Sequence, residues 1–431
     1  MPGRERGTRL ASGRRRIVII ALLVAIALTV AGAGCGGDDD AGQGTDLTWF
    51  VAIQPGGSIQ EIAKRCSEQS NGEYSIDLQL LPTTASDQRD QLVRRLGAED
   101  SSVDLLGMDV IWTAEFANAG WLREFPADLR EQVTKDVFDS VIETASFDGK
   151  LYGAPFNSNT QLLFYRTDEV ERPPKTWGQM ISEAERLGMS IQVQANRYEG
   201  YTVLVNSLIE SAGAQILSDP DTIALEQGPT EEALATIGRL ANSSAAAADI
   251  STSTEDTARL GFEAGGSAFM INYPFAYGSA KENAPEVFKN LGIAEFPRVV
   301  PDLPSKPPLG GFNIGVGAFT EHPEQAFDAA ACIGSPQSQL TATELDGLPP
   351  TRQDLYTSKV VRDAYPGFAK LIERSIDRAA PRPLTPAYTD LSLAIQSALH
   401  PPDSIDPDDP QAAYDDLREK LDQAVKREGL L

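Results

Sequence analysis

The organisation of the chain is decided by the stretch Leu151-Tyr-Gly-Ala-Pro-Phe-Asn-Ser-Asn-Thr-Gln-Leu-Leu-Phe-Tyr-Arg166. Gly153 and Pro155 lead an extended segment out of one apolar body, and the polar run Asn157 to Thr160 precedes a second apolar strand, Leu162 to Tyr165. A strand that crosses between two lobes has this pattern, and its amide and hydroxyl groups would supply hydrogen-bond donors and acceptors at the floor of a cleft. A loop joining two strands of one sheet has the same local pattern, so both interpretations stay open.

The first 34 residues have the layout of a secretory signal. Six arginines precede an apolar run from Ile17 to Val30, and small residues lead directly into Cys35. The apolar run is short for a membrane-spanning helix. Small residues before a cysteine resemble the lipobox of bacterial lipoproteins, which predicts lipidation of Cys35, although Gly32 stands where that motif usually has leucine. A plain signal peptide cut near Ala33 is the alternative, and both place the mature protein outside the cytoplasm.

Residues 35–45 are too polar to pack and are predicted to form a flexible tether. Without residues 1–34, which contain six arginines and one glutamate, 31 basic and 61 acidic residues remain, a net charge of −30. An acidic body of this kind argues against binding to nucleic acid or to anionic lipid. The lipid on Cys35 is therefore the only membrane attachment we expect. The remaining 397 residues exceed one ordinary core, so two domains are expected.

Cysteine and histidine usage excludes several kinds of chemistry. Cys66 and Cys332 each lie in a helical pattern, and an oxidising compartment favours a disulfide between them, with two buried free thiols as the alternative. The only histidines, His322 and His400, both precede prolines. Histidine-based catalysis and histidine-rich metal binding are therefore disfavoured, and we expect neither a metal nor a cofactor.

The N-terminal half of the chain alternates strands and helices. Strands are predicted over residues 46–53, 74–81 and 103–108, with helices from Ser58, capped by that serine with Glu61 three residues later, and from Ser86. This order predicts an α/β body with a mainly parallel sheet, in which ligands bind beyond the carboxyl ends of the strands. The residues at or just beyond predicted strand ends are Gln54, Asp109 and Trp112.

Later segments indicate two further crossings. Residues 191–195 and 271–273 are predicted strands, and Thr252-Ser-Thr254 is predicted to cap a helix that contains Glu255. A second crossing is expected at residues 293–297 and a third at residues 347–352, on either side of a strand over residues 309–316. The predicted lobes are then residues 46–156 plus 297–350 and residues 157–296 plus 351–431.

The order of these segments resembles that of extracytoplasmic solute-binding proteins of carbohydrate ABC importers. The matching pieces are Asp104-Leu-Leu to Trp112, Tyr152-Gly-Ala-Pro155, Phe262-Glu-Ala-Gly-Gly-Ser-Ala-Phe-Met270, Gly310-Gly-Phe-Asn313 and Gly347-Leu-Pro-Pro350. Similarity to the LpqY group of trehalose-binding lipoproteins is carried by Ala114 to Trp121, Asn159-Thr-Gln-Leu-Leu163, Gln194-Ala-Asn196 with Glu199-Gly200, and Pro381-Arg-Pro-Leu-Thr-Pro-Ala-Tyr388. The resemblance implies a two-lobed periplasmic-binding-protein fold, a monomer without enzymatic activity, permease subunits as partners, and trehalose or a near analogue as ligand.

The resemblance also implies a set of polar ligand contacts. Carboxylates suit vicinal hydroxyls because charge-assisted hydrogen bonds are the stronger ones. Asp109 is the first candidate acceptor, with a helix N-cap as its alternative role, and Asn159 is a candidate contact in the crossing segment. Arg382, held between two prolines, would bind hydroxyls from the second lobe, unless it is a surface arginine paired with a carboxylate. Glu255 is a further candidate, although a glutamate in a first helical turn is also favoured by the helix dipole.

Aromatic planes would cover the apolar faces of a sugar, and Trp112 and Tyr273 are the candidates. Tyr273 stands where the trehalose-binding group has tryptophan, which leaves a smaller plane. Gly311 would let the backbone approach a sugar closely, and Gln54 is an additional contact. A secreted glycoside hydrolase using Asp109 and Glu255, a binder of another oligosaccharide such as maltose, and an adhesive surface lipoprotein remain as alternative functions.

Overall fold

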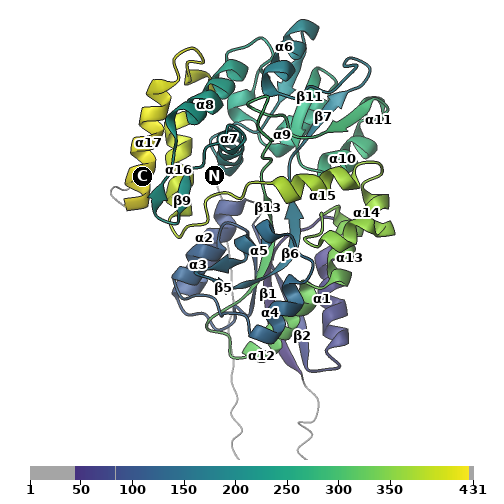
Figure 1. The fold of residues 1–431 in the computed structure, drawn as a ribbon. Coiled ribbons are helices and arrows are strands. Elements are labelled where there is room, and N and C mark those ends of the chain that lie inside the picture. The colour runs from purple at the N-terminus through teal and green to yellow at the C-terminus, as the bar shows by residue number, and fades with distance from the viewer. Residues whose placement is uncertain (1–43, 83, 427–431) are drawn as a thin grey trace, which may run out of the picture. The chain divides into compact units, whose positions relative to one another are not determined.

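The computed structural model of the chain describes residues 44–82 and 84–426 (Figure 1). The predicted signal segment, Cys35 and nearly all of the predicted tether lie outside the described residues. From Gly44 onward the chain forms one compact unit that contains two main sheets. Within the described ranges, no helix combines the length and apolar character needed to cross a bilayer.

The first sheet has five strands in the order β2-β1-β3-β13-β6. These strands are β1 (Thr45–Ala52), β2 (Tyr74–Leu81), β3 (Leu105–Asp109), β6 (Gly153–Asn159) and β13 (Gly310–Val316). β2, β1 and β3 pair in parallel, whereas β13 is antiparallel to both β3 and β6. Four strands therefore run in one direction and β13 runs in the other, which confirms the predicted mainly parallel sheet and adds one reversed strand.

The second sheet has four strands in the order β12-β7-β11-β8. They are β7 (Leu162–Arg166), β8 (Ser190–Gln192), β11 (Ser267–Asn272) and β12 (Leu291–Ala294). β11 is parallel to β8, and β7 is antiparallel to both β11 and β12. This sheet also contains a single reversed strand, here β7.

The crossing segment connects the two sheets, as one of the two sequence interpretations predicted. Only Thr160 and Gln161 separate β6 in the first sheet from β7 in the second. Since β6 runs parallel to β3, it leaves the first sheet at the carboxyl edge. Since β7 is the reversed strand of the second sheet, it enters that sheet at the carboxyl edge as well. The two carboxyl edges are therefore joined directly by this short connection.

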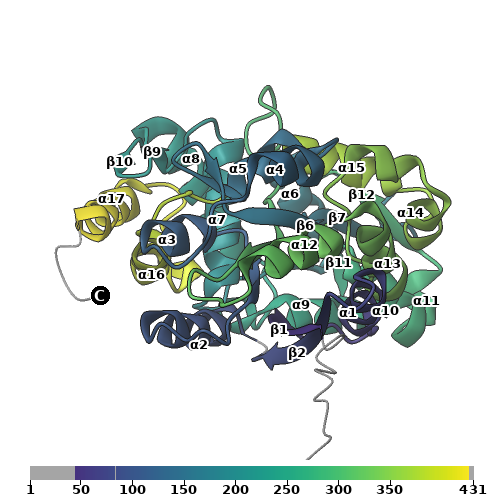
Figure 2. The same ribbon diagram turned by 90° about the horizontal axis from the view of Figure 1, so that it is seen from below.

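Helices cover both faces of the first sheet. The helices of this part are α1 (Ser58–Gln69), α2 (Ala85–Gly97), α3 (Thr113–Asn118), α4 (Ala127–Thr134), α5 (Asp139–Thr144), α12 (Pro323–Ile333) and α13 (Pro336–Asp346). Trp49 packs in the core cluster that holds α1 and α12, whereas its neighbour Phe50 packs with α2. Figure 2 shows α1 and α2 on opposite sides of β1 and β2. Burial on both faces explains the continuous apolar run Trp49 to Ala52 in β1, whereas the edge strand β2 keeps exposed polar residues.

The second sheet packs into a separate core cluster with helices from two parts of the chain. The helices beyond the first lobe are α6 (Trp177–Leu187), α7 (Glu199–Ser211), α8 (Gln227–Ala241), α9 (Glu255–Glu263), α10 (Phe275–Asn283), α11 (Pro285–Phe288), α14 (Lys359–Ala364), α15 (Ala369–Arg378), α16 (Tyr388–Leu399) and α17 (Gln411–Lys426). α16 contacts both α7 and α17. The C-terminal helices therefore complete the lobe that the crossing strand enters.

One predicted helix cap is wrong and another is confirmed. The N-cap of α1 is Gly57, with φ of 82°, and the side chain of Ser58 makes no capping hydrogen bond. Instead, the Asp346 carboxylate accepts from the backbone N–H of Gly56 and, at 2.9 Å, from that of Ser58. Asp346 lies 288 residues away, so local sequence could not reveal it. Thr254 caps α9 as predicted, in a capping box with Thr257.

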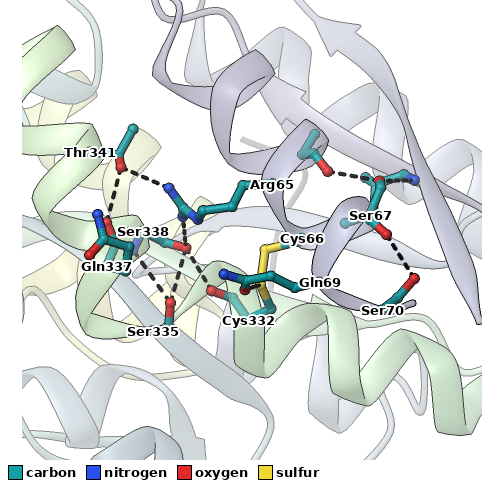
Figure 3. Close-up of a disulfide and its surroundings, with 12 residues drawn as sticks. Arg65, Cys66, Ser67, Gln69, Ser70, Cys332, Ser335, Gln337, Ser338 and Thr341 are labelled. Carbon is teal, nitrogen blue, oxygen red and sulfur yellow. Dashed lines mark hydrogen bonds between the residues drawn. A yellow bond between two sulfur atoms is a disulfide. The ribbon is translucent and has the colours of Figure 1, made fainter. Parts of the chain in front are cut away.

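A disulfide joins α1 to α12 (Figure 3). Cys66 and Cys332 have Cα atoms 5.9 Å apart and are separated by 266 residues of sequence. Beside the bond, the guanidinium of Arg65 donates to Thr341 Oγ1 at 2.9 Å and to Ser338 Oγ at 2.6 Å, both on α13. Covalent and polar links thus hold the first helix against helices from the end of the same lobe.

Replacing both cysteines by alanine should lower the free energy of unfolding by about 2–5 kcal/mol, because the disulfide closes a long loop in the unfolded chain. Urea denaturation of the two proteins measures the difference. Wild type treated with a reducing agent should approach the variant, and the variant itself should not respond to that agent. Equal stabilities of oxidised wild type and variant would contradict this role of the bond.

Candidate functional site

Three of the predicted ligand contacts lie together at the carboxyl edge of the first sheet. Asp109 is the last residue of β3 and pairs with Phe312 of β13. Asn159 is the last residue of β6 and pairs with Gly310, next to Gly311. Because β3, β13 and β6 are neighbours, the sheet itself brings these positions side by side.

Gly311 has a structural explanation of its own. Its φ is 131°, and a Cβ atom at this position would lie 2.1 Å from the backbone oxygen of Asn157 in β6. Any side chain would therefore push β13 away from β6. The glycine is required by this strand contact whether or not a ligand approaches it.

Arg382 is the centre of a polar network between the lobes. It lies between α15 and α16, with 4 % of its side chain exposed. Its Nη2 is 3.0 Å from Asp109 Oδ1 at the edge of the first sheet, and its Nη1 is 2.6 Å from Glu199 Oε1 in α7. Burial alone would lower the pKa of Arg382, but the charge of Asp109, followed by Tyr388 and Glu199, raises it well above the ordinary value.

Glu199 is held by three donors from the second lobe and its C-terminal helices. Besides Arg382, the hydroxyl of Tyr388 donates to Oε1 and Ser392 Oγ donates to Oε2 at 2.7 Å. Glu199 is also the first residue of α7, where the helix dipole stabilises an anion. A carboxylate bound in this way fixes the guanidinium of Arg382 in one orientation. The arginine stays able to donate further hydrogen bonds, since a guanidinium carries five N–H groups.

Glu255 and Tyr273 lie at the facing edge of the second lobe. The hydroxyl of Tyr198 donates to Glu255 Oε2 at 2.7 Å, and Asn272, the last residue of β11, donates to the backbone oxygen of Glu255 at 3.0 Å. Burial, followed by the charges of Glu255, Asp109 and Glu199, raises the pKa of Tyr273, while Arg382 opposes the rise. The charges of Glu255, Asp109, Glu199 and Arg382 therefore all act on the Tyr273 hydroxyl, so residues of both lobes determine the electrostatics of this region.

A cavity of about 340 Å³ opens beside this network. Residues of the first lobe, including Ile111 and Trp112, line one wall, and Tyr198, Glu199 and Tyr388 line another. Its volume lies within the range of small-molecule sites. Aromatic rings and carboxylates on its walls suit a ligand with apolar faces and hydroxyl edges.

Several predicted ligand contacts also have structural roles within the protein. Trp112 is only 2 % exposed and stacks on Phe116 with ring centroids 6.1 Å apart, so most of its surface belongs to the core. Asp109 Oδ1 also accepts from the backbone N–H of Ile111 at 3.2 Å. Asp109 is nevertheless not the N-cap of α3, because that position is Trp112. Gln54 follows β1, and its backbone oxygen accepts from Gly57 at 3.2 Å. Asn159 Oδ1 accepts from the backbone N–H of Thr160 at 3.0 Å.

The sequence interpretation did not select Tyr198, Glu199 or Tyr388 as site residues. Glu199 and Tyr388 lie in segments that carry the resemblance to the trehalose-binding group, but neither was assigned a contact, and the polar turn of residues 196–200 indicated only the start of a long helix. A first-turn glutamate is common to most helices, so this signal does not single out Glu199. Its contact with an arginine 183 residues later is a product of tertiary structure.

Comparison with known proteins identifies the family. The sequence profile of the bacterial extracellular solute-binding proteins matches residues 61–369, most of the chain. The chain belongs to this family. It is a binding protein and not an enzyme, so the glycoside hydrolase alternative is set aside. No group of three or more His, Cys, Asp or Glu side chains among the described residues is placed to hold a metal ion.

Individual relatives agree with this assignment. A probable ABC transporter-binding protein of Deinococcus radiodurans is 29 % identical over 330 residues, covering 71 % of this chain and 76 % of the relative. The diacetylchitobiose-binding protein DasA of Streptomyces coelicolor is 22 % identical over 360 residues, covering 79 % and 83 %.

Solved structures show the same two-lobed fold. Maltose-bound MalE3 of T. maritima superposes with a TM-score of 0.77 at 23 % identity, covering 89 % of this chain and 99 % of that chain. The GacH receptor of Streptomyces glaucescens also reaches a TM-score of 0.77, at 19 % identity and the same coverages. At these identities the likeness establishes the fold of this solute-binding protein and nothing finer.

Substituting Arg382 by methionine should lower the stability of the solute-binding protein by roughly 3–5 kcal/mol, because Asp109 and Glu199 would lose the cation that pairs with them in a buried site. The matched control is Arg374→Met. Arg374 is half exposed, and its Nη2 is 3.7 Å from Glu295 Oε1, so its loss should cost about 0–1 kcal/mol. Urea denaturation measures both changes, and similar costs for the two variants would contradict the account of the network.

Glu255 should give the solute-binding protein a pH-dependent stability. Burial raises the pKa of Glu255 above its ordinary value of 4.5, although the Tyr198 hydrogen bond opposes the rise. The folded state therefore keeps this proton at pH values where the unfolded chain has lost it. The stabilising contribution of the protonated form is complete below pH 4.5 and disappears as the pH rises through the folded pKa.

Glu255→Gln lacks this titration, so its stability should increase relative to wild type as the pH rises from 4.5 through the raised pKa of Glu255. Melting curves at a series of pH values measure the difference. Asp256→Asn, in the same helical turn but with 76 % of its side chain exposed, is the matched control and should run parallel to wild type. A constant offset between Glu255→Gln and wild type across this range would contradict the prediction.

Proposed function

We propose that this solute-binding protein captures a disaccharide, with trehalose as the first candidate, and delivers it to the permease subunits of an ABC importer. The observation that carries the proposal is the buried Arg382 guanidinium between Asp109 and Glu199, beside the tyrosines of the facing lobe. Such a network offers charged donors and acceptors in pairs, which suits the vicinal hydroxyls of a sugar. The relatives named for diacetylchitobiose, maltose and acarbose support a saccharide ligand.

In this proposal, sugar hydroxyls are bound by Asp109, Asn159, Glu255, Arg382, Gly311 and Gln54. Apolar surface comes from Tyr273 and Trp112. The two lobes rotate about the crossings. The proposed first lobe is residues 46–156 plus 297–350, and the proposed second lobe is residues 157–296 plus 351–431. The ligand stabilises the closed form because it contacts both lobes there. The protein works as a monomer anchored to the outer face of the membrane by a lipid on Cys35.

Maltose is the alternative ligand, since the T. maritima structure contains maltose and Tyr273 is smaller than the tryptophan of the trehalose-binding group. A panel of trehalose, maltose, sucrose, glucose and a non-sugar separates these possibilities. At 100 times its dissociation constant, the true ligand should add roughly 2.7 kcal/mol of stability to residues 44–431. A thermal shift with maltose but not trehalose would retain the site and replace the ligand, and no shift with any sugar would refute the proposal.

Asp109→Ala and Asn159→Ala should each weaken binding of the preferred sugar by roughly 10-fold or more, because each removes a hydrogen bond made to or by a buried group. Isothermal titration of each variant measures the loss. Asp302→Ala, at an exposed position of the loop between β12 and β13, is the control and should bind like wild type. Full affinity in both site variants would place the ligand elsewhere.

A further inference from the structure

The turn that follows β1 is held by a side chain of α13. The turn closes with a hydrogen bond of 3.2 Å from the backbone N–H of Gly57 to the backbone oxygen of Gln54, and α1 begins at the next residue. The carboxylate of Asp346, the last residue of α13, accepts from the backbone N–H groups of Gly56 and Ser58. One carboxylate thus fixes both the turn and the start of α1.

The glycines of the turn make its conformation depend on this distant carboxylate. Gly57 has a φ of 82°, and a Cβ atom on Gly56 would overlap the backbone oxygen of Leu345, so the two positions require glycine. Two consecutive glycines give a turn many accessible conformations. The hydroxyl of Ser58 is buried and has no hydrogen-bond partner among the described residues, so it does not cap the helix. The charge-assisted hydrogen bonds to Asp346 therefore select the conformation of the turn.

The carboxylate itself is firmly placed. Directly after Asp346, Gly347 ends α13 with a φ of 62°, and the hydroxyl of Tyr365 donates to the backbone oxygen of Gly347 at 2.7 Å. Earlier in the same helix, the guanidinium of Arg65 donates to Thr341 at 2.9 Å, which holds α13 against α1 (Figure 3). Asp346 is therefore a fixed point to which the glycine turn is attached.

The turn lies at the edge of the sheet where the predicted ligand contacts gather. β1 runs parallel to β3, and Phe50 pairs with Leu106. Continued along both strands, this register brings Gln54 level with the residue after Asp109. Parallel sheets bind ligands beyond their carboxyl ends, and Asp109 is the residue that pairs with Arg382 there. A change in the turn would therefore move Gln54 relative to this part of the site.

We propose that Asp346 is a positioning residue for ligand binding, which holds the turn so that the side chain of Gln54 meets a sugar hydroxyl at the same edge as Asp109. The inference rests on the proposed function, in which Gln54 is a ligand contact. It deepens that function because Asp346 needs no contact with the sugar and acts through the backbone of Gly56 and Ser58.

The test is a double-mutant cycle between positions 54 and 346, measured by titrating the full mature chain with trehalose and with maltose. Gln54→Ala and Asp346→Ala should each weaken binding of the preferred sugar by about 5- to 20-fold, the loss expected for one buried hydrogen bond. Because Asp346 acts through Gln54, the double variant should bind within about 2-fold of the weaker single variant. Losses that multiply, or an Asp346→Ala variant with the affinity of wild type, would overturn the proposal.

Two controls separate positioning from a general loss of stability. Arg65→Met loosens the same pair of helices away from the turn, so it should lower the melting temperature and keep the affinity within about 2-fold of wild type. Glu344→Ala, exposed on the same helix as Asp346, should change neither quantity. Asp346→Asn keeps one uncharged acceptor and takes the place of Asp346→Ala in the cycle where the alanine variant does not fold. An equal loss of affinity in Arg65→Met and the Asp346 variant would contradict the positioning role.

Hydrogen exchange of the Ser58 amide tests the attachment of the turn without any sugar. Loss of the carboxylate in Asp346→Ala should accelerate this exchange at least about 10-fold, because the amide loses its acceptor. Binding of neither trehalose nor maltose by wild type would count against the proposed transport ligand. Unchanged exchange at Ser58 would instead overturn the role of Asp346, whether or not a sugar binds.

Discussion

The structure depends on a positive charge buried between the two lobes. The guanidinium of Arg382 lies almost entirely out of water and is paired with Asp109 from one lobe and Glu199 from the other. An unpaired charge at this depth would cost several kcal/mol, so the two carboxylates are a condition for the arginine to be there. Pro381 and Pro383 restrict the backbone on either side of it. The carboxylate of Glu199 is in turn fixed by Tyr388 and Ser392, so the network extends into the C-terminal helices.

Strand direction explains why this network lies where it does. A chain that leaves one sheet at its carboxyl edge and enters the next at its carboxyl edge must run backwards in the second sheet, as β7 does. The return crossing has the same effect on β13 in the first sheet. One reversed strand in each sheet thus brings Asp109 and Asn159 to the same interlobe region as Tyr273. Parallel sheets bind ligands beyond their carboxyl ends, and here two such edges contribute to one site.

Local chemistry was sufficient to predict much of this architecture. Most strands and the Thr254 cap of α9 follow from periodicity, glycine, proline and capping residues close in sequence, whereas the local pattern of the crossing left a loop within one sheet open as an alternative. The errors and omissions involve distant partners. Asp346 replaces the predicted Ser58 cap, and Glu199 gains its role only by meeting Arg382. The pairing of Cys66 with Cys332 stayed open for the same reason, because spacing along the chain contains no distance between helices. Asp109 was assigned to the site from its position at a strand end and Asn159 from resemblance, and their adjacency came from the sheet.

The same network constrains how a ligand can act. Arg382 already bridges the lobes through Asp109, so hydrogen bonds from a sugar to these groups do not by themselves favour closure. A ligand shifts the equilibrium only by the difference between its affinities for the open and closed forms. That difference must come from groups that meet the ligand together only when the lobes approach, such as Asn159 at the end of β6 in the first sheet and Glu255 and Tyr273 from the second lobe. The positions of Asn159, Glu255 and Tyr273 should then determine which sugar binds. The Arg382 network supplies the buried charges of the site and is already formed without a sugar.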